Sequence, residues 1–297
     1  MVAIADLIFG KLIGWYIDHY KLPGDYQKFQ YMINNTNEDI LLLGSSVCMN
    51  SIIPELVEKE FHMSCFNGGA NAQSLEYVDT MIDIVLNHHT PKIIILCLRP
   101  YDLFLKTNER YNMFRIYYKH GFPKIDRYLE SGSLTEYLAM QSSFYRLNTY
   151  GWRLLLYHFK SYNELNNGGF VGKPKLAINP PLVIQPDVSS QEELPKPNIE
   201  KLEILRQIFI QCKKHNVTLF VTIPPAYYEI GNVQKYQCHL FKEYCDENAV
   251  PFFDDFYNPY FIKHPEFFYD NNHLNVDGAK NYTKQLLEKL QTYVKKN

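Results

Sequence analysis

The stretch Ile-Leu-Leu-Leu-Gly-Ser-Ser, residues 40–46, decides the fold that this sequence predicts. Its unbroken apolar run, residues 40–43, is typical of a strand buried on both faces, as the strands of parallel sheets are. Gly44 ends the run and allows a sharp turn. Ser46 then stands at the carboxyl end of the strand, where ligands and catalytic groups gather in open α/β sheets. Because Gly and Ser are common in turns, the stretch alone favours an ordinary strand-to-helix connection.

Similar apolar runs recur along the chain. We expect strands at residues 40–43, 63–66, 92–98, 218–223 and 251–253, and helices at 54–60, 74–87, 198–215, 233–248 and 277–296. Strands that alternate with helices of this length predict an α/β fold with one parallel sheet of about five strands and right-handed crossovers. We expect the first strand to be central, with helices on both faces of the sheet.

Residues 100–197 interrupt this alternation between the third and fourth strands. The first half is aromatic and partly helical, notably over 134–159, whereas 166–197 is rich in Gly, Pro and Asn and has no periodicity. A long irregular stretch inside a domain is usually functional or mobile. We interpret 100–197 as an insertion, which leaves a cap over a cleft, a partner surface and mere decoration as alternatives. The chain then divides into an N-terminal helical segment, 1–39, and one domain, 40–297.

The first 20 residues do not have the pattern of a secretory signal, and charges at positions 6, 11 and 18 argue against a clean membrane span. Ile4, Ile8, Leu12 and Tyr16 recur every four residues, which is typical of an amphipathic helix. Two interpretations remain open: a helix packed on the domain, or the segment that follows a membrane anchor encoded upstream.

Composition excludes some functions. The chain has 297 residues and a net charge of −2, so nothing points to nucleic acid or to an anionic membrane surface. Its 24 Tyr and 19 Phe can build a large core and line a cleft. The six cysteines include no Cys-x-x-Cys pair, and Cys238 and Cys245 are too far apart on a helix to form a disulfide. We therefore predict free thiols, no metal site and no cofactor.

A second motif lies at residues 269–275, Tyr-Asp-Asn-Asn-His-Leu-Asn. Asp270 and His273 are three positions apart and can face the same way on a turn. A carboxylate there can accept the Nδ1–H of the imidazole and leave Nε2 free as a base. If the fold brings Ser46 to that Nε2, the serine gains the base that a hydroxyl nucleophile needs. Taken singly, Asp270 as a helix cap and His273 as a half-buried turn residue are the simpler alternatives.

Together the two motifs resemble the SGNH, or GDSL-type, hydrolase superfamily, over residues 40–99 and 217–296. The resemblance implies a flavodoxin-like three-layer α/β/α sandwich. It implies Ser46 as nucleophile, in Gly-Ser-Ser where the family usually has Gly-Asp-Ser, with His273 as base and Asp270 as its orienting acid. The loop 67–72 resembles the family block that supplies an oxyanion-hole N–H. Ala72, or less readily Gly69, takes that place beside the N–H of Ser46.

One family feature is missing. After the third strand the family usually has an Asn that donates to the oxyanion, but this chain reads Leu-Arg-Pro-Tyr-Asp at 98–102, so Tyr101 is nearest to that position. Loss of one such donor typically costs about 100-fold in rate or more. Either another group replaces it or the enzyme is slow or specialised. Variants of this kind look similar to bacterial cell-envelope members, some of which transfer O-acyl groups on polysaccharides and often follow a membrane anchor.

Three functions follow from the resemblance. The first is a serine esterase that removes an acyl group from a carbohydrate or another polar ester. The second is a polysaccharide O-acyltransferase with the same triad. The third is a degenerate member that binds a glycan or a partner protein without turnover. The expected partner is a small-molecule or glycan ester rather than a nucleic acid. The expected location is the bacterial cell envelope or periplasm, with the cytoplasm as the alternative.

Overall fold

The computed structural model describes residues 1–106, 111–147, 165–184, 187–229 and 231–294. A five-stranded parallel sheet has the order β2-β1-β3-β5-β7. Its strands are β1 (Ile40–Gly44), β2 (Cys65–Asn67), β3 (Ile93–Cys97), β5 (Thr218–Ile223) and β7 (Phe252–Asp254). Numbered along the chain this order is 2-1-3-4-5, which is the flavodoxin-like arrangement. The predicted α/β fold class is confirmed.

The position of β1 differs from the expectation. β1 pairs with β2 on one side and with β3 on the other, so Ile40 lies opposite both Cys65 and Ile93. The middle strand is β3, because two strands follow beyond it and one lies beyond β1. The prediction that the first strand is the middle one was therefore wrong by one position. The chain reverses its direction of travel across the sheet between β1 and β3, and β1 ends beside this switch point, where such folds bind ligands.

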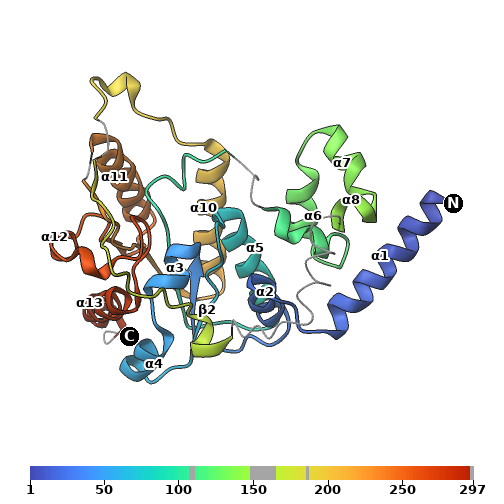
Figure 1. Ribbon diagram of the computed structural model, residues 1–297, viewed down its shortest axis with the longest axis horizontal. Coiled ribbons are helices and arrows are strands. Elements are labelled where there is room, and N and C mark those ends of the chain that lie inside the picture. The colour runs from blue at the N-terminus through green and yellow to red at the C-terminus, as the bar shows by residue number, and fades with distance from the viewer. Residues whose placement is uncertain (107–110, 148–164, 185–186, 230, 295–297) are drawn as a thin grey trace.

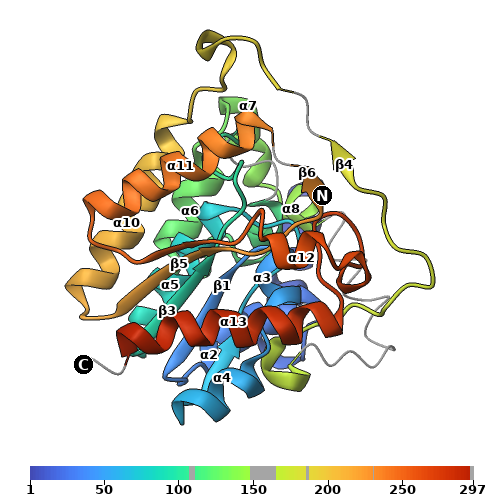
Figure 2. The same cartoon turned by 90° about the vertical axis from the view of Figure 1, so that its left-hand side faces the viewer.

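Alternate side chains of β1 point into two apolar cores, one on each face of the sheet. Leu41 and Leu43 belong to one core, and Ile40 and Leu42 to the other. The first core is covered by α2 (Asp25–Asn34), α5 (Leu75–Leu86), α10 (Ile199–Lys214) and α11 (Asn232–Glu247). The second is covered by α3 (Ser46–Ser51), α4 (Pro54–Phe61), α12 (Pro259–Ile262) and α13 (Val276–Val294). Figure 2 shows α13 in front of the strands. Burial on both faces explains the continuous apolar run of β1.

The described part of the insertion begins with short helices. They are η1 (Tyr111–Tyr117), α6 (Pro123–Glu130), α7 (Leu134–Met140) and α8 (Ser143–Leu147). The helix expected over 134–159 is thus broken between α7 and α8, and residues 148–164 lie outside the described ranges. The second half contains η2 (Asn166–Gly169), β4 (Val183–Ile184) and η3 (Gln191–Glu193). β4 pairs in parallel with β6 (Tyr228–Glu229), a small sheet that the sequence did not predict.

The N-terminal helix α1 (Val2–His19) lies at one end of the molecule, far from α11, α12 and α13 (Figure 1). It packs on α8 through Phe9, whose ring stacks on Phe144 at 4.8 Å. Its buried residues are Ile13, Tyr16 and Ile17. Of the four apolar residues in the expected repeat, only Tyr16 faces the protein, whereas Ile4, Ile8 and Leu12 are exposed. In the described part of the chain, no helix is both long and apolar enough to span a bilayer.

Candidate active site

Ser46 lies where β1 ends and α3 begins. It is the first residue of α3, its side chain is half-buried, and no acceptor among the described residues takes its backbone N–H. The turn before it requires glycine, because a Cβ on Gly44 would lie 2.3 Å from the carbonyl oxygen of Cys97 on β3. Close approach of the two strands thus fixes where the chain turns. The hydroxyl of Ser46 is thereby presented at the carboxyl edge of the sheet.

The structure brings together the three residues of the predicted triad. The Oγ of Ser46 lies 2.8 Å from Nε2 of His273. On the other side of the ring, Nδ1 lies 2.8 Å from Oδ1 and 2.9 Å from Oδ2 of Asp270. With the proton on Nδ1 donated to the carboxylate, Nε2 is the lone-pair atom that faces the hydroxyl. The imidazole is therefore oriented to accept a proton from Ser46.

Asp270 is held in place by its own loop. Its Oδ1 accepts hydrogen bonds from the backbone N–H of Asn272 at 2.8 Å and of His273 at 2.9 Å. Burial alone would raise the pKa of Asp270, but the bond from the His273 ring and these N–H groups outweigh it, so that the pKa lies below its ordinary value. The carboxylate is therefore ionised at neutral pH. It can hold the ring and stabilise a positive charge on it.

The same loop rules out the simpler role for Asp270. A bridge between Phe268 and Leu274 closes the loop, and α13 begins only at Val276. The residue that caps α13 is Asn275, whose Oδ1 accepts the N–H of Gly278 at 3.0 Å. Asp270 is therefore not the helix cap that its position before α13 suggested. Its side chain serves the histidine instead.

The loop after β2 runs beside the end of β1. The N–H of Ala70 donates to the carbonyl of Gly44 at 3.2 Å, which brings the loop next to the turn that carries Ser46. Gly69 does not fit the oxyanion role, because its N–H donates to Oδ1 of Asn67 at 3.0 Å. Ala72 adopts a left-handed φ of 59°, a conformation that is strained for a residue with a Cβ. Of the two predicted donors in this loop, Ala72 is the one we retain.

Asn67 connects this loop to the helix that carries the serine, and sequence analysis did not single it out. It is fully buried at the end of β2. Its Nδ2 donates to the carbonyls of Cys48 at 3.0 Å and Ile52 at 2.9 Å, while its Oδ1 accepts the N–H of Gly69. Every polar atom of this side chain is used to join the loop to α3. The only signal in the sequence was an amide directly after the strand expected at residues 63–66.

Tyr101 lies on the turn after β3, and its side chain is 37% exposed. Asp102 holds this turn by accepting the N–H of Arg99 at 2.8 Å and pairing with its guanidinium. Arg99 also donates to the carbonyl of Gln73 at 3.0 Å, so the turn is tied to the loop that contains Ala72. The guanidinium lies 4.8 Å from the centre of the Tyr101 ring. Tyr101 is thus attached to the same framework as the predicted donor Ala72.

A cavity of about 110 Å³ opens between this turn and the start of α5. Its lining includes Tyr101 and Gln73 together with the charged side chains of Arg99, Glu76 and Lys201. Lys201 is fully buried and forms an ion pair with Glu76, and it donates to the hydroxyl of Ser74 at 2.8 Å. The cavity beside Tyr101 is therefore lined by polar side chains that an ion pair and hydrogen bonds keep in place.

Part of the insertion runs beside the site as a strap, which we define as residues 170–181. On one side, Val171 exchanges hydrogen bonds with α3: its N–H donates to Met49 O at 3.2 Å and its carbonyl accepts Nδ2 of Asn50 at 2.6 Å. On the other side, the carbonyl of Lys173 accepts the N–H of Val276 at 3.0 Å. The strap therefore joins the helix of the serine to the start of α13, just beyond the histidine loop.

Polar side chains surround the histidine loop. The hydroxyl of Tyr228 donates to Oδ1 of Asn272 at 3.0 Å, and Nδ2 of Asn271 donates to the carbonyls of Pro181 at 2.7 Å and Tyr227 at 2.9 Å. These contacts attach the loop both to the strap and to the segment after β5. Sequence analysis did not identify Tyr228, because no local pattern links it to residues 270–273.

No family model and no curated protein matches this chain. Among solved structures, a protein of Streptococcus pneumonia described as a platelet activating factor is 12% identical with a TM-score of 0.47, and the match covers 97% of this chain and 95% of that one. A lipolytic protein of the G-D-S-L family from Desulfitobacterium hafniense is 10% identical with a TM-score of 0.42, covering 84% and 97%. An acetyl xylan esterase is 10% identical with a TM-score of 0.41, covering 86% and 98%. The functional proposal therefore depends on the side chains of this chain.

Proposed function

We propose that this protein is a serine esterase in which Ser46 is the nucleophile, His273 the general base and Asp270 the group that orients the base. The observation that carries this proposal is the continuous contact from the Ser46 hydroxyl through the imidazole to the Asp270 carboxylate. Each residue alone has a simpler explanation, but the three meet in the geometry that activates a hydroxyl. Ser46 comes from the start of α3, and Asp270 and His273 come from the loop before α13.

In the proposed reaction, Oγ of Ser46 attacks the ester carbonyl carbon while its proton moves to Nε2 of His273. The tetrahedral intermediate then expels the alcohol, which leaves with the proton from Nε2, and the acyl group stays on Ser46. A water molecule attacks the acyl-enzyme next and gives its proton to the same nitrogen. Collapse releases the carboxylic acid and returns that proton to Ser46. Asp270 stabilises the imidazolium during both halves of the cycle.

The developing oxyanion needs hydrogen-bond donors in fixed positions. The backbone N–H of Ser46 is one donor in this proposal, since no described residue accepts it. The N–H of Ala72 is the proposed second donor, because the resemblance assigns it that role and Ala72 follows two residues after Ala70, whose N–H bonds to the carbonyl of Gly44. By the resemblance, Tyr101 is the residue nearest in sequence to the position of the family's third donor. The proposed enzyme thus works with two backbone donors and a tyrosine at the third position.

The proposed substrate is a polar ester, such as an O-acyl group on a carbohydrate. The side chains around the histidine loop are Tyr228, Asn271 and Asn272, and the cavity beside Tyr101 is lined by charged groups. Such surroundings favour a substrate with hydroxyl groups over one with a long hydrocarbon chain. A transferase with the same acyl-enzyme remains the alternative, distinguished by whether water or a sugar hydroxyl takes the acyl group.

The test uses a fluorophosphonate probe, followed by mapping of the labelled peptide by mass spectrometry, and hydrolysis of p-nitrophenyl acetate. We expect labelling on Ser46 and release of nitrophenol, both abolished by Ser46→Ala. Adding a sugar acceptor during turnover separates the two enzymatic alternatives, because a transferase forms acylated sugar at the expense of free acetate. Absence of both labelling and turnover would leave the non-enzymatic glycan- or partner-binding function.

A further inference from the structure

The outer face of α1 is apolar and uncovered. Its large side chains are each more than half exposed: Ile4, Leu7, Ile8, Leu12 and Trp15. The inner face is apolar as well, because it packs against α8 and the neighbouring core. A helix that is apolar all round is normally buried or in contact with lipid. The inner face of α1 therefore packs against protein, whereas the outer face is not covered by any of the described residues.

The acidic residue in the first half of α1 is withdrawn from this outer face. Asp6 turns toward α8, where Oδ1 accepts the Ser142 hydroxyl at 2.8 Å and the Phe144 N–H at 2.7 Å, and Oδ2 accepts the Ser143 N–H at 2.9 Å. Burial raises the pKa of Asp6, but these hydrogen bonds outweigh it and lower the pKa overall. The carboxylate thus serves as a cap for α8. It adds no negative charge to the exposed strip.

Two charged side chains remain on the exposed side of α1, Lys11 among the apolar residues and Asp18 near the C-terminal end. Lys11 lies between Ile8 and Trp15 on this face, and its long stem can lie along apolar surface while its ammonium reaches lipid phosphates. At the C-terminal end of α1, Trp15 stacks on His19 at 4.8 Å and makes an edge contact with Tyr20 at 5.7 Å. Trp and Tyr are the side chains that gather at the boundary between lipid tails and water.

A second copy of the chain fits the outer face of α1 less well than a lipid surface does. Eighteen helical residues span about 27 Å, and a strip about 10 Å wide along them offers on the order of 300 Å². A stable protein interface needs about 800 Å² from each partner. The strip is therefore too small for a dimer held by α1 alone. A lipid surface has no such minimum area, because binding grows with each apolar side chain that enters it.

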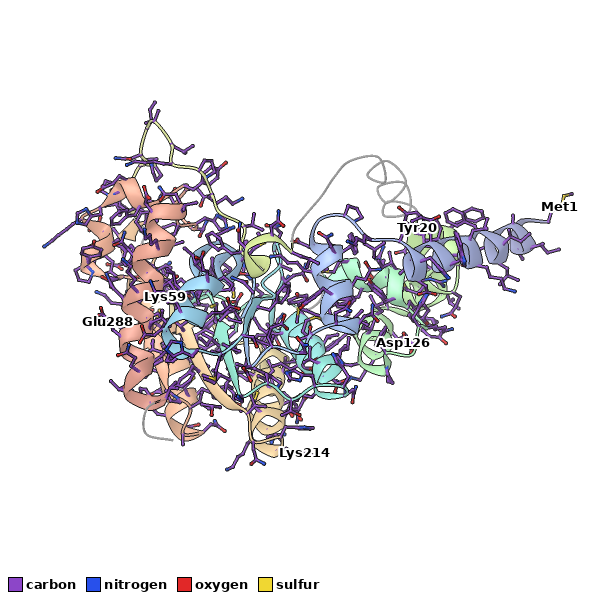
Figure 3. The ribbon with its side chains drawn as sticks, turned by 90° about the horizontal axis from the view of Figure 1, so that it is seen from below. Met1, Tyr20, Lys59, Asp126, Lys214 and Glu288 are labelled. Atoms are coloured by element: carbon purple, nitrogen blue, oxygen red, sulfur yellow. The ribbon has the colours of Figure 1, made fainter. Side chains whose placement is uncertain are left out.

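We propose that α1 is a membrane-surface helix: its outer face lies in the plane of a phospholipid membrane, with the apolar side chains in the acyl boundary and Lys11 at the phosphates. Figure 3 shows α1 extending from Tyr20 to Met1 at one end of the molecule, opposite the end that carries Glu288 of α13. The inference is independent of the proposed esterase activity.

The test uses the full chain and vesicles of phosphatidylcholine and phosphatidylglycerol. Trp15 and Trp152 are the two tryptophans, so Trp152→Phe leaves Trp15 as the reporter. We expect the protein to float with the vesicles and the emission of Trp15 to shift to shorter wavelength. Raising the salt from about 0.1 M to 1 M should leave most of the binding intact, because apolar burial rather than surface charge supplies it.

Ile8→Glu/Leu12→Glu places two carboxylates on the outer face without touching the inner one, and we expect it to weaken vesicle binding at least about tenfold. The matched control is Ile178→Glu/Ile199→Glu, which changes two exposed isoleucines elsewhere and should bind as the wild type does. Circular dichroism and thermal unfolding check that both variants fold. Two results would overturn the proposal: vesicle binding that survives Ile8→Glu/Leu12→Glu, or no vesicle binding by the wild type. In the second case, a dimer in sedimentation that this variant dissociates would identify a second copy of the chain as the occupant of the face.

Discussion

The hydroxyl of Ser46 and Nε2 of His273 lie 2.8 Å apart, although 227 residues separate them in the chain. The contact exists because β1 ends beside the switch point of the sheet and the loop before α13 returns to the same edge. A contact so remote in sequence must be supported from both sides. On the serine side the support is Asn67 and the strap, and on the histidine side it is Asp270 and Tyr228.

The two adjacent serines should behave differently. Ser46→Ala removes the nucleophile and should abolish probe labelling and ester turnover. Ser45 is buried, and its hydroxyl has no hydrogen-bond partner among the described residues. Ser45→Ala should therefore keep labelling and leave the free energy of unfolding unchanged or raised by about 1 kcal/mol. Peptide mapping locates the label. A label on Ser45 in the wild type would show that Ser45, and not Ser46, is the nucleophile.

Replacing Asp270 by Asn should leave the loop in place but favour the wrong imidazole tautomer, and lower kcat by about 10⁴-fold. It should also change the pH dependence of stability. Because the folded pKa of Asp270 lies below its unfolded value, the carboxylate stabilises the fold above that unfolded value. This contribution is lost as pH falls through the folded pKa.

The contribution of the Asp270 carboxylate to stability is measured by urea unfolding of the wild type and of Asp270→Asn at several pH values. The difference in their free energies of unfolding should be largest near neutrality and shrink in acid. An equal difference at pH 7 and at the acid end would mean that ionisation of Asp270 does not contribute.

Asn67 should matter for stability. Asn67→Ala leaves the carbonyls of Cys48 and Ile52 and the N–H of Gly69 without their buried partner. At about 1–3 kcal/mol for each such group, we expect a loss of about 3 kcal/mol or more in the free energy of unfolding. The control is Asn71→Ala, at an exposed position of the same loop. This substitution should change the free energy of unfolding by less than about 0.5 kcal/mol. Similar unfolding midpoints for both variants would contradict the positioning role.

Tyr101→Asn tests the third oxyanion position. An amide there should add a donor to the two backbone groups and raise kcat, by up to about 2 kcal/mol of transition-state stabilisation. Tyr101→Phe, which keeps the ring beside Arg99 but removes the hydroxyl, is the control and should change kcat little. A large loss of rate in both variants would show instead that the tyrosine hydroxyl is itself a donor.

The parts of the site that the sequence predicted are those with a local signature. Gly44 and the serines follow an apolar strand, and Asp270 lies three residues before His273, so spacing alone placed them on the right elements. The strand pattern likewise predicted the parallel sheet. The order of the strands depends on the crossover connections between them. No local sequence pattern indicates that order, so the middle strand could not be predicted.

Contacts between distant segments could not be predicted in this way. The sequence gives no indication that Asn67 reaches α3, that the N–H of Gly69 is already used, or that Tyr228 meets Asn272. The N-terminal repeat was misleading for a related reason. Both faces of α1 are apolar, so periodicity did not identify the face that packs, and the position of Asp6 against α8 decided it.

The strap carries a consequence for how this protein can diverge. In its bonds to Asn50, Met49, Asn271 and Val276, the strap contributes only backbone atoms. Substitutions along residues 170–181 therefore leave these bonds available, as long as the chain keeps its path and Val171 is not replaced by proline. We expect relatives to vary at most positions of this segment while retaining its length, with Phe170 kept as part of the core and Gly172 kept because a Cβ there would lie 2.7 Å from the Val276 side chain. An alignment of relatives should show many substitutions in this segment but no insertions or deletions.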